Sequence, residues 1–134
     1  MAEAERKAVH AVLAPDLRLY LVWVPAIPGD SLATARLAAA RFPDPRIRHF
    51  WDEGWAFGRQ VGRLLKLPGE FGKPGDFGPG WDVFLLYDRD AAWSAGGLPR
   101  PATWMHTLMG VVIPGVPLLD APVLRRRVEE LLRK

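Results

Sequence analysis

The chain has 134 residues, of which 49% are hydrophobic and 25% are charged, which is typical of a globular protein and excludes a disordered one. This length is enough for one domain with a sizeable core, so we expect a single domain over residues 1–134. The formal net charge is only +3, and much of the basic excess lies in residues 125–134, away from the aromatic residues. This distribution does not favour a nucleic-acid binder.

Cysteine is absent, which excludes disulfides, thiolate nucleophiles and cysteine-ligated metals. Thiol–disulfide exchange is excluded for the same reason, because it requires a thiolate that attacks sulfur. Arginine outnumbers lysine 14 to 4 and there are 13 prolines, a composition compatible with a thermophilic source.

Two features predict a cytoplasmic protein that does not enter a membrane. Four of the first ten residues are charged, where a signal peptide has an apolar region. The longest apolar run, residues 19–27, is about half the length that a bilayer-spanning helix requires.

The first half of the chain predicts helices and strands in alternation. Residues 2–14 have apolar side chains at helical spacing. Residues 17–24, "LRLYLVWV", form a continuous apolar run, which predicts a strand buried on both faces of a parallel sheet. After the turn "PAIPGD", Asp30 or Ser31 can cap a helix that extends to about residue 41.

A second strand and helix follow. Residues 46–52, "RIRHFWD", predict a short strand in which Ile47, His49 and Trp51 share one face. Asp52 is expected to cap a helix over about residues 53–67, in which two glycines one turn apart, Gly58 and Gly62, would let the helix approach a sheet closely.

The second half begins with a glycine- and proline-rich loop, residues 68–80, for which we expect no regular structure. Two strands, residues 81–88 and 102–110, are joined without a helix and should form an antiparallel hairpin. Asp120 is expected to cap a final helix. Strands separated by helices should pair in parallel, so the pattern predicts an α/β fold with a mixed four-stranded sheet flanked by helices on both faces.

This order of elements resembles the thioredoxin fold over nearly the whole chain. Thioredoxins end their first core strand in a tryptophan that precedes two cysteines separated by two residues. Here the corresponding run is Trp23-Val24-Pro25-Ala26-Ile27, with Val24 and Ile27 where the sulfurs would be. The sequence is also similar to a family of uncharacterised, cysteine-free thioredoxin-like proteins that share the motifs "HFWD", "WDVFLLYD" and "WMH". The resemblance implies a thioredoxin-like domain without redox activity.

Six tryptophans and two Trp-Asp pairs supply the candidate binding residues. Tryptophan combines a large apolar surface with one N–H donor, which suits it to interfaces as well as to cores. The carboxyl ends of parallel strands are where open α/β folds place ligands. The candidate binding residues are Trp23, Val24, Pro25, Ile27, Asp30, Trp51, Asp52, Trp55, Trp81 and Asp82.

The same residues also allow structural roles. The prolines at 25 and 28 can simply stiffen a loop whose acid caps a helix, and the tryptophans can be core residues. Asp82 begins a buried strand, where we expect it to accept hydrogen bonds or to line a pocket.

Catalytic and metal motifs are weak. The spacing of His49 and Asp52 matches no usual metal-ligand set, and the sequence has neither a phosphate-binding loop nor a serine nucleophile motif. We therefore expect no catalytic residue, no metal and no cofactor.

Three functions remain open. The first is a module that binds a protein or peptide partner, or forms a homodimer. The second is a small-molecule binder or hydrolase-like enzyme that uses His49, Asp52 and Asp82 in a tryptophan-lined pocket. The third is a structural subunit with a flat apolar patch.

Overall fold

The computed structural model describes residues 12, 14–69, 75–108 and 110–134. The chain divides into two compact units. We call residues Pro15–Trp81 the parallel unit, and the unit that contains Asp82–Lys134 the antiparallel unit. The helix expected over residues 2–14 lies almost wholly outside the described residues. A single domain over residues 1–134 stays a prediction.

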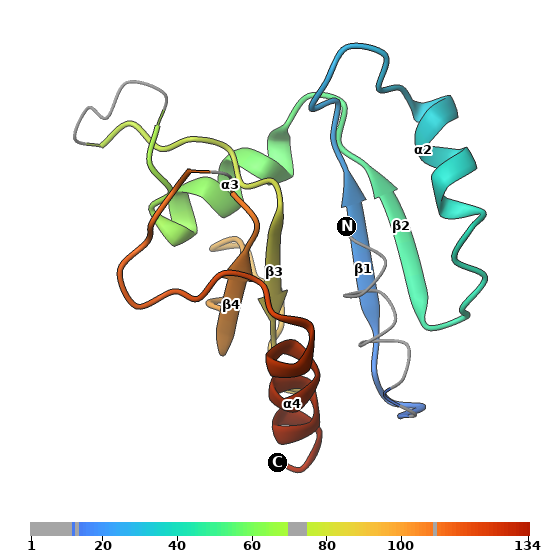
Figure 1. Cartoon of the computed structure of the whole chain (residues 1–134), viewed down its shortest axis with the longest axis vertical. Helices are drawn as coiled ribbons and strands as arrows, with labels where there is room; N and C mark the ends of the chain where they lie inside the picture. Colours follow the sequence, from blue (N-terminus) through green and yellow to red (C-terminus); the bar gives the residue numbers. More distant parts are fainter. Residues whose placement is uncertain (1–11, 13, 70–74, 109) are drawn as a thin grey trace. The chain divides into compact units, whose positions relative to one another are not determined.

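The parallel unit is built on two strands, β1 (Leu19–Trp23) and β2 (Ile47–Trp51), which pair in parallel. Their arrows run side by side in the same direction in Figure 1. The helix α2 (Leu32–Ala39) connects them and lies beside β2. Parallel strands require such a crossover because a tight turn can join only antiparallel strands. The predicted parallel pairing is therefore confirmed.

The strand register gives the β1–β2 pair two distinct faces. Tyr20 lies opposite Arg48, and Val22 lies opposite Phe50. These four residues define what we call the outer face, because side chains alternate across a strand. Tyr20 is exposed, so the prediction that the first strand is buried on both faces is wrong, and Arg48 and Phe50 of β2 are exposed beside it. The predicted shared face of Ile47, His49 and Trp51 is confirmed, because β2 alternates between half-buried and exposed residues.

The sequence suggested that the two glycines of helix α3 (Ala56–Leu65) pack against a sheet. In the structure they pack against a loop instead. A Cβ atom on Gly62 would overlap the carbonyl oxygen of Gly78, and one on Gly58 would lie 3.4 Å from the carbonyl oxygen of Gly80. The amide of Gly80 donates to the carbonyl of Gly58 over 2.7 Å. Pro68 and Phe77 form an antiparallel bridge, so the described part of this loop is more ordered than expected.

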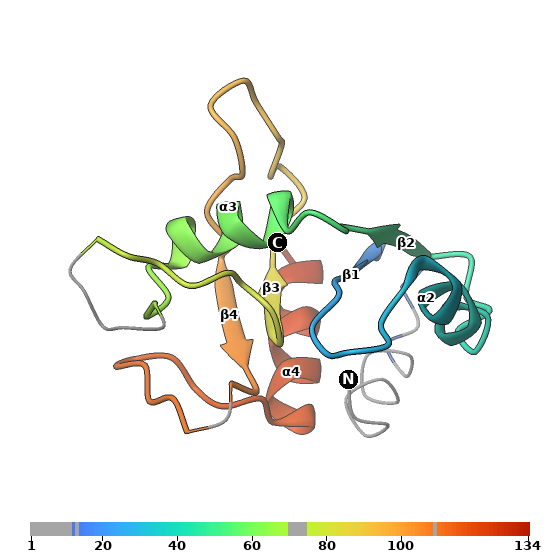
Figure 2. The same cartoon turned by 90° about the horizontal axis from the view of Figure 1, so that it is seen from above.

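In the antiparallel unit, β3 (Val83–Leu86) pairs with β4 (Thr103–His106), which confirms the predicted hairpin. Figure 2 shows the long connection between the two strands extending away from them. Leu119 donates its amide to the carbonyl of His106 at the far edge of β4. The helix α4 (Ala121–Leu132) begins where Asp120 accepts a hydrogen bond from the amide of Val123 over 2.8 Å, so this predicted cap is confirmed.

The predicted thioredoxin-like fold is wrong. The described residues form two separate two-stranded sheets, one parallel and one antiparallel, and no four-stranded sheet. Each predicted pairing forms between strands that are neighbours in the sequence. The step that fails is the joining of the two pairs, which would require hydrogen bonds between distant segments of the chain.

The close approach at Gly62 predicts a specific sensitivity. Gly62→Ala should lower the free energy of unfolding by about 1–3 kcal/mol, because the new methyl group overlaps the Gly78 carbonyl and outweighs the helical preference of alanine. Gly54→Ala is the matched control, because no atom lies within 4 Å of the added Cβ. Urea unfolding measures both, and equal stabilities of the two variants would contradict the packing.

Candidate functional site

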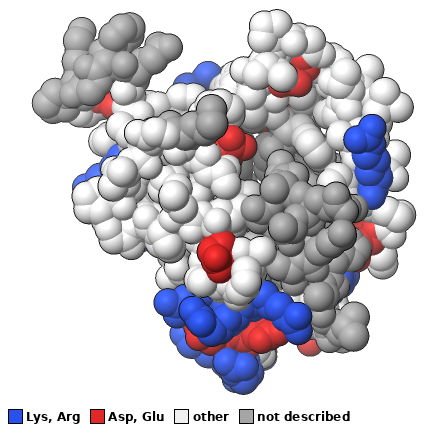
Figure 3. All heavy atoms as spheres, viewed as in Figure 1, with Lys and Arg blue, Asp and Glu red and all other residues white. Residues whose placement is uncertain are grey.

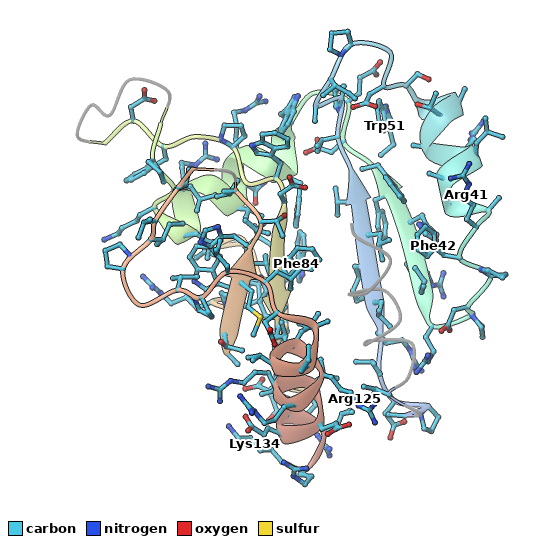
Figure 4. All side chains as sticks on the ribbon, viewed as in Figure 1. Arg41, Phe42, Trp51, Phe84, Arg125 and Lys134 are labelled. Atoms are coloured by element: carbon cyan, nitrogen blue, oxygen red, sulfur yellow. The ribbon has the colours of Figure 1, made fainter. Side chains whose placement is uncertain are left out.

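An aromatic cluster lies at the carboxyl end of β1. The indole Nε1 of Trp23 donates to Nδ1 of His49 over 3.2 Å, and the two rings stack with centroids 6.1 Å apart. Phe42 contacts both rings, at centroid distances of 6.5 Å to Trp23 and 6.3 Å to His49. Figure 4 labels Phe42 next to β2. Because Nδ1 accepts, the neutral imidazole of His49 carries its proton on Nε2.

The loop after β1 is organised by Asp30. Its Oδ2 accepts hydrogen bonds from the amides of Ala26 and Ile27, both at 2.9 Å. The side chain that caps α2 is Ser31, which accepts from the amide of Thr34 over 3.2 Å. Of the two caps that the sequence offered, Ser31 is therefore the one used. Asp30 acts inside the loop instead.

The N-cap residue of α3 is Trp55 rather than Asp52, because the helix begins at Ala56 instead of at residue 53, but the carboxylate of Asp52 still accepts from the first amides of the helix. Its Oδ1 accepts from the amide of Ala56 over 2.8 Å, and its Oδ2 accepts from the amide of Gly58 over 3.0 Å. Its own amide donates to the carbonyl of Trp23 over 2.8 Å. Both carboxylate oxygens are thus engaged by the backbone, so the N-terminus of α3 already holds an anion.

Trp55 stands at the start of α3 in a left-handed conformation, with φ of 57°. Such a backbone is costly for a bulky side chain, by about 1–2 kcal/mol. The two hydrogen bonds that Asp52 accepts from residues 56 and 58 flank this position and offset the cost. Asp52 therefore has a structural role, because its side chain stabilises the strained turn at Trp55.

The structure brings most of the candidate binding residues into the parallel unit, but leaves one outside it. Val24, Pro25, Trp51 and Trp55 are partly exposed there, and Trp81 is 41% exposed. Figure 4 labels Trp51 at the end of β2. Asp82 belongs to the antiparallel unit.

The backbone conformation explains why an aspartate stands at position 82, which the sequence alone did not. Its φ is 50°, and aspartate tolerates this left-handed conformation better than most residues. Its carbonyl accepts from the amide of Thr107 over 2.9 Å, which extends the β3–β4 ladder. The side chain itself is exposed, so the expected buried environment is not present.

The candidate binding residues named from the sequence did not include the outer face. Tyr20 is 65% exposed and Phe50 is 51% exposed, and their ring centroids lie 6.2 Å apart. The alternation of "RIRHFW" does place Arg48 and Phe50 on the face opposite to that of His49, but it does not indicate that their face is exposed. The continuous apolar run of the neighbouring strand gave no sign that Tyr20 is exposed, since the other residues of β1 are half-buried.

The antiparallel unit buries two polar groups without hydrogen-bond partners among the described residues. These are Nδ1 of His106, a residue that is 1% exposed, and the hydroxyl of Tyr87. Burial raises the pKa of Tyr87. Neither residue was a sequence candidate.

Basic side chains gather on α4, where Figure 3 shows them with acidic groups between them. Arg125 pairs with Glu129 over 2.8 Å, and Arg127 pairs with Glu130 over 2.9 Å. These pairs are exposed and contribute little stability. They also neutralise part of the helix, so α4 is not a strongly cationic surface.

Within the described residues, no group of three or more His, Asp or Glu side chains is arranged to hold a metal ion. The helices of the same residues include none that is long and apolar enough to span a membrane. Comparison with protein-family models, curated proteins and solved structures finds no match to this chain.

The carboxylate of Asp52 predicts a graded loss of stability. Asp52→Ala should lower the free energy of unfolding by about 1–2 kcal/mol, because both acceptors of the α3 amides are lost. Asp52→Asn keeps one carbonyl acceptor and should lose less. Glu53→Ala, at the exposed neighbouring position, is the control in the same urea titrations. An Asp52→Ala variant no less stable than Glu53→Ala would argue against this role of Asp52.

Tyr87 predicts a loss of stability at alkaline pH. Because its pKa is raised in the folded protein, the unfolded chain loses this proton first, so stability falls as the pH rises above about 10. Tyr87→Phe removes the unpartnered hydroxyl and should unfold at an equal or higher urea concentration near neutral pH. It should also show a smaller alkaline loss than the parent. Parallel pH profiles of the two proteins would contradict this assignment.

Proposed function

We propose that this chain is a non-catalytic binding module that holds a protein or peptide partner through the parallel unit. The observation that carries the proposal is the exposed apolar surface of that unit. Seven of the ten large apolar side chains exposed by the described residues belong to it: Tyr20, Ile27, Leu32, Leu37, Phe50, Phe77 and Trp81. Exposed apolar surface of this kind marks interaction sites when the side chains are contiguous. Tyr20 and Phe50 meet that condition, because their rings contact each other.

The engaged carboxylate of Asp52 does not favour a catalytic role for this residue. A general base needs a free acceptor within reach of its substrate. Asp30 uses one oxygen to hold two loop amides, and Asp52 uses both of its oxygens on α3. The enzyme alternative, which relied on His49, Asp52 and Asp82, gains no support from this arrangement.

Self-association is the second candidate, and the same two exposed rings favour it. A homodimer that buries Tyr20 and Phe50 would remove them from water without any other partner. Sedimentation velocity of the full chain distinguishes the two candidates. A dimer that Tyr20→Ser and Phe50→Ser together convert to monomer would assign the rings to self-association.

Selection of peptides from a random displayed library by the full chain tests the main proposal. We expect enriched peptides whose binding weakens about tenfold or more in the Tyr20→Ser, Phe50→Ser double variant, because exposed aromatic anchors dominate such contacts. Leu37→Ser removes a comparably exposed apolar side chain from α2 and is the control. Circular dichroism verifies that each variant is folded. Failure to enrich any peptide, or equal binding by the double variant and the parent, would refute the proposal.

A further inference from the structure

The outer face combines a pair of aromatic rings with a positive charge. The ring centroids of Tyr20 and Phe50 lie 6.2 Å apart, with the ring planes inclined by 32°, so the two neighbouring rings form an apolar ridge across the two strands. Arg48 lies directly opposite Tyr20 in the strand register, next to this ridge. It is exposed and makes no ion pair with the described residues.

No acidic residue of the outer face balances the positive charge of Arg48. Tyr20, Val22, Arg48 and Phe50 include no carboxylate. Arg18 is also exposed and lies two residues before Tyr20, with its guanidinium directed to the neutral carbonyls of Pro15 and Leu17. By contrast, Arg46 is paired with Asp44 over 2.7 Å. A free guanidinium beside an apolar ridge complements a partner that carries a carboxylate beside an apolar side chain.

We infer that the outer face binds a peptide segment in which an aromatic or long aliphatic side chain is adjacent to an acidic residue. The inference rests on the proposed function and adds the chemistry of the partner. The apolar side chain would cover the Tyr20–Phe50 ridge, and the carboxylate would accept hydrogen bonds from the guanidinium of Arg48. An arginine suits this role because its planar donors match both oxygens of a carboxylate.

Two other occupants fit the face less well. A nucleic acid gains its affinity from several phosphate contacts, whereas this face offers Arg48 and, next to it along β1, only Arg18, and the rings are inclined rather than parallel. A second copy of the chain would bring a second Arg48 and no carboxylate to the shared surface of a two-fold dimer. Charge complementarity therefore favours the acidic peptide.

Two fluorescein-labelled pentapeptides test the inference by fluorescence anisotropy on the full chain. One has phenylalanine between two glutamates, with a glycine at each end, and the other has lysines in place of the glutamates. We expect the acidic peptide to bind about tenfold more tightly at low salt. The variant Arg48→Glu should reverse this order. Arg36→Glu, at an exposed position of α2, is the charge-matched control and should leave the order unchanged.

The outcomes separate this inference from the proposed function. Equal binding of the two peptides, or the same effect of Arg36→Glu and Arg48→Glu, would overturn the acidic preference while leaving peptide binding intact. Tighter binding of a labelled oligothymidylate than of the acidic peptide would overturn it in favour of nucleic acid. No binding by either pentapeptide would overturn the inference, and no binding by library-selected peptides as well would remove the proposed function.

Discussion

The hydrogen bond between the indole of Trp23 and the imidazole of His49 joins the two parallel strands through their side chains. Backbone pairing sets the register, and this bond links the two strands on the face that is turned toward Phe42. Because side chains alternate along a strand, Tyr20 and Phe50 must then point to the opposite face. The exposed aromatic pair and the Trp23–His49–Phe42 cluster therefore lie on opposite faces of the same two strands.

Polar side chains at the carboxyl ends of these strands serve the backbone. Asp30 holds the loop after β1, Ser31 caps α2, and Asp52 accepts from the first amides of α3. In many α/β proteins the same edge of the sheet supplies free amides to a ligand. Here side-chain oxygens of the chain itself accept hydrogen bonds from several of those amides. The surface with unused binding capacity is instead the outer face of the strands, which is why the functional proposal is placed there.

Sequence patterns predicted the helices, the strands and the pairing of neighbouring strands well, because each of these depends on residues that are close together in the sequence. The segment between Trp23 and Ile47 contains a helix, so the flanking strands pair in parallel, whereas no helix separates Leu86 from Thr103. The four-stranded sheet was wrong because joining the two pairs depends on contacts between distant segments, which the order of elements does not encode. The contact of Gly62 with Gly78 was missed for the same reason.

Prediction of the candidate site was limited by a different ambiguity. An apolar run such as that around Tyr20 has the same letters whether one face or both faces are covered, so exposure could not be deduced. Two adjacent residues, Asp30 and Ser31, could each cap α2, and only the path of the loop decides between them. The tryptophans attracted the binding hypothesis, yet the more exposed rings of the strands are Tyr20 and Phe50.

The measurement that tests this account most directly is the tautomer of His49 in the full chain, read from the ¹⁵N NMR spectrum of its ring at about pH 8, where imidazoles are ordinarily neutral. The Trp23 bond predicts an unprotonated Nδ1 and a proton on Nε2, with the indole proton of Trp23 close to the His49 ring. A proton on Nδ1 would contradict the bond, and with it the side-chain link between the two strands on the face opposite to Tyr20 and Phe50.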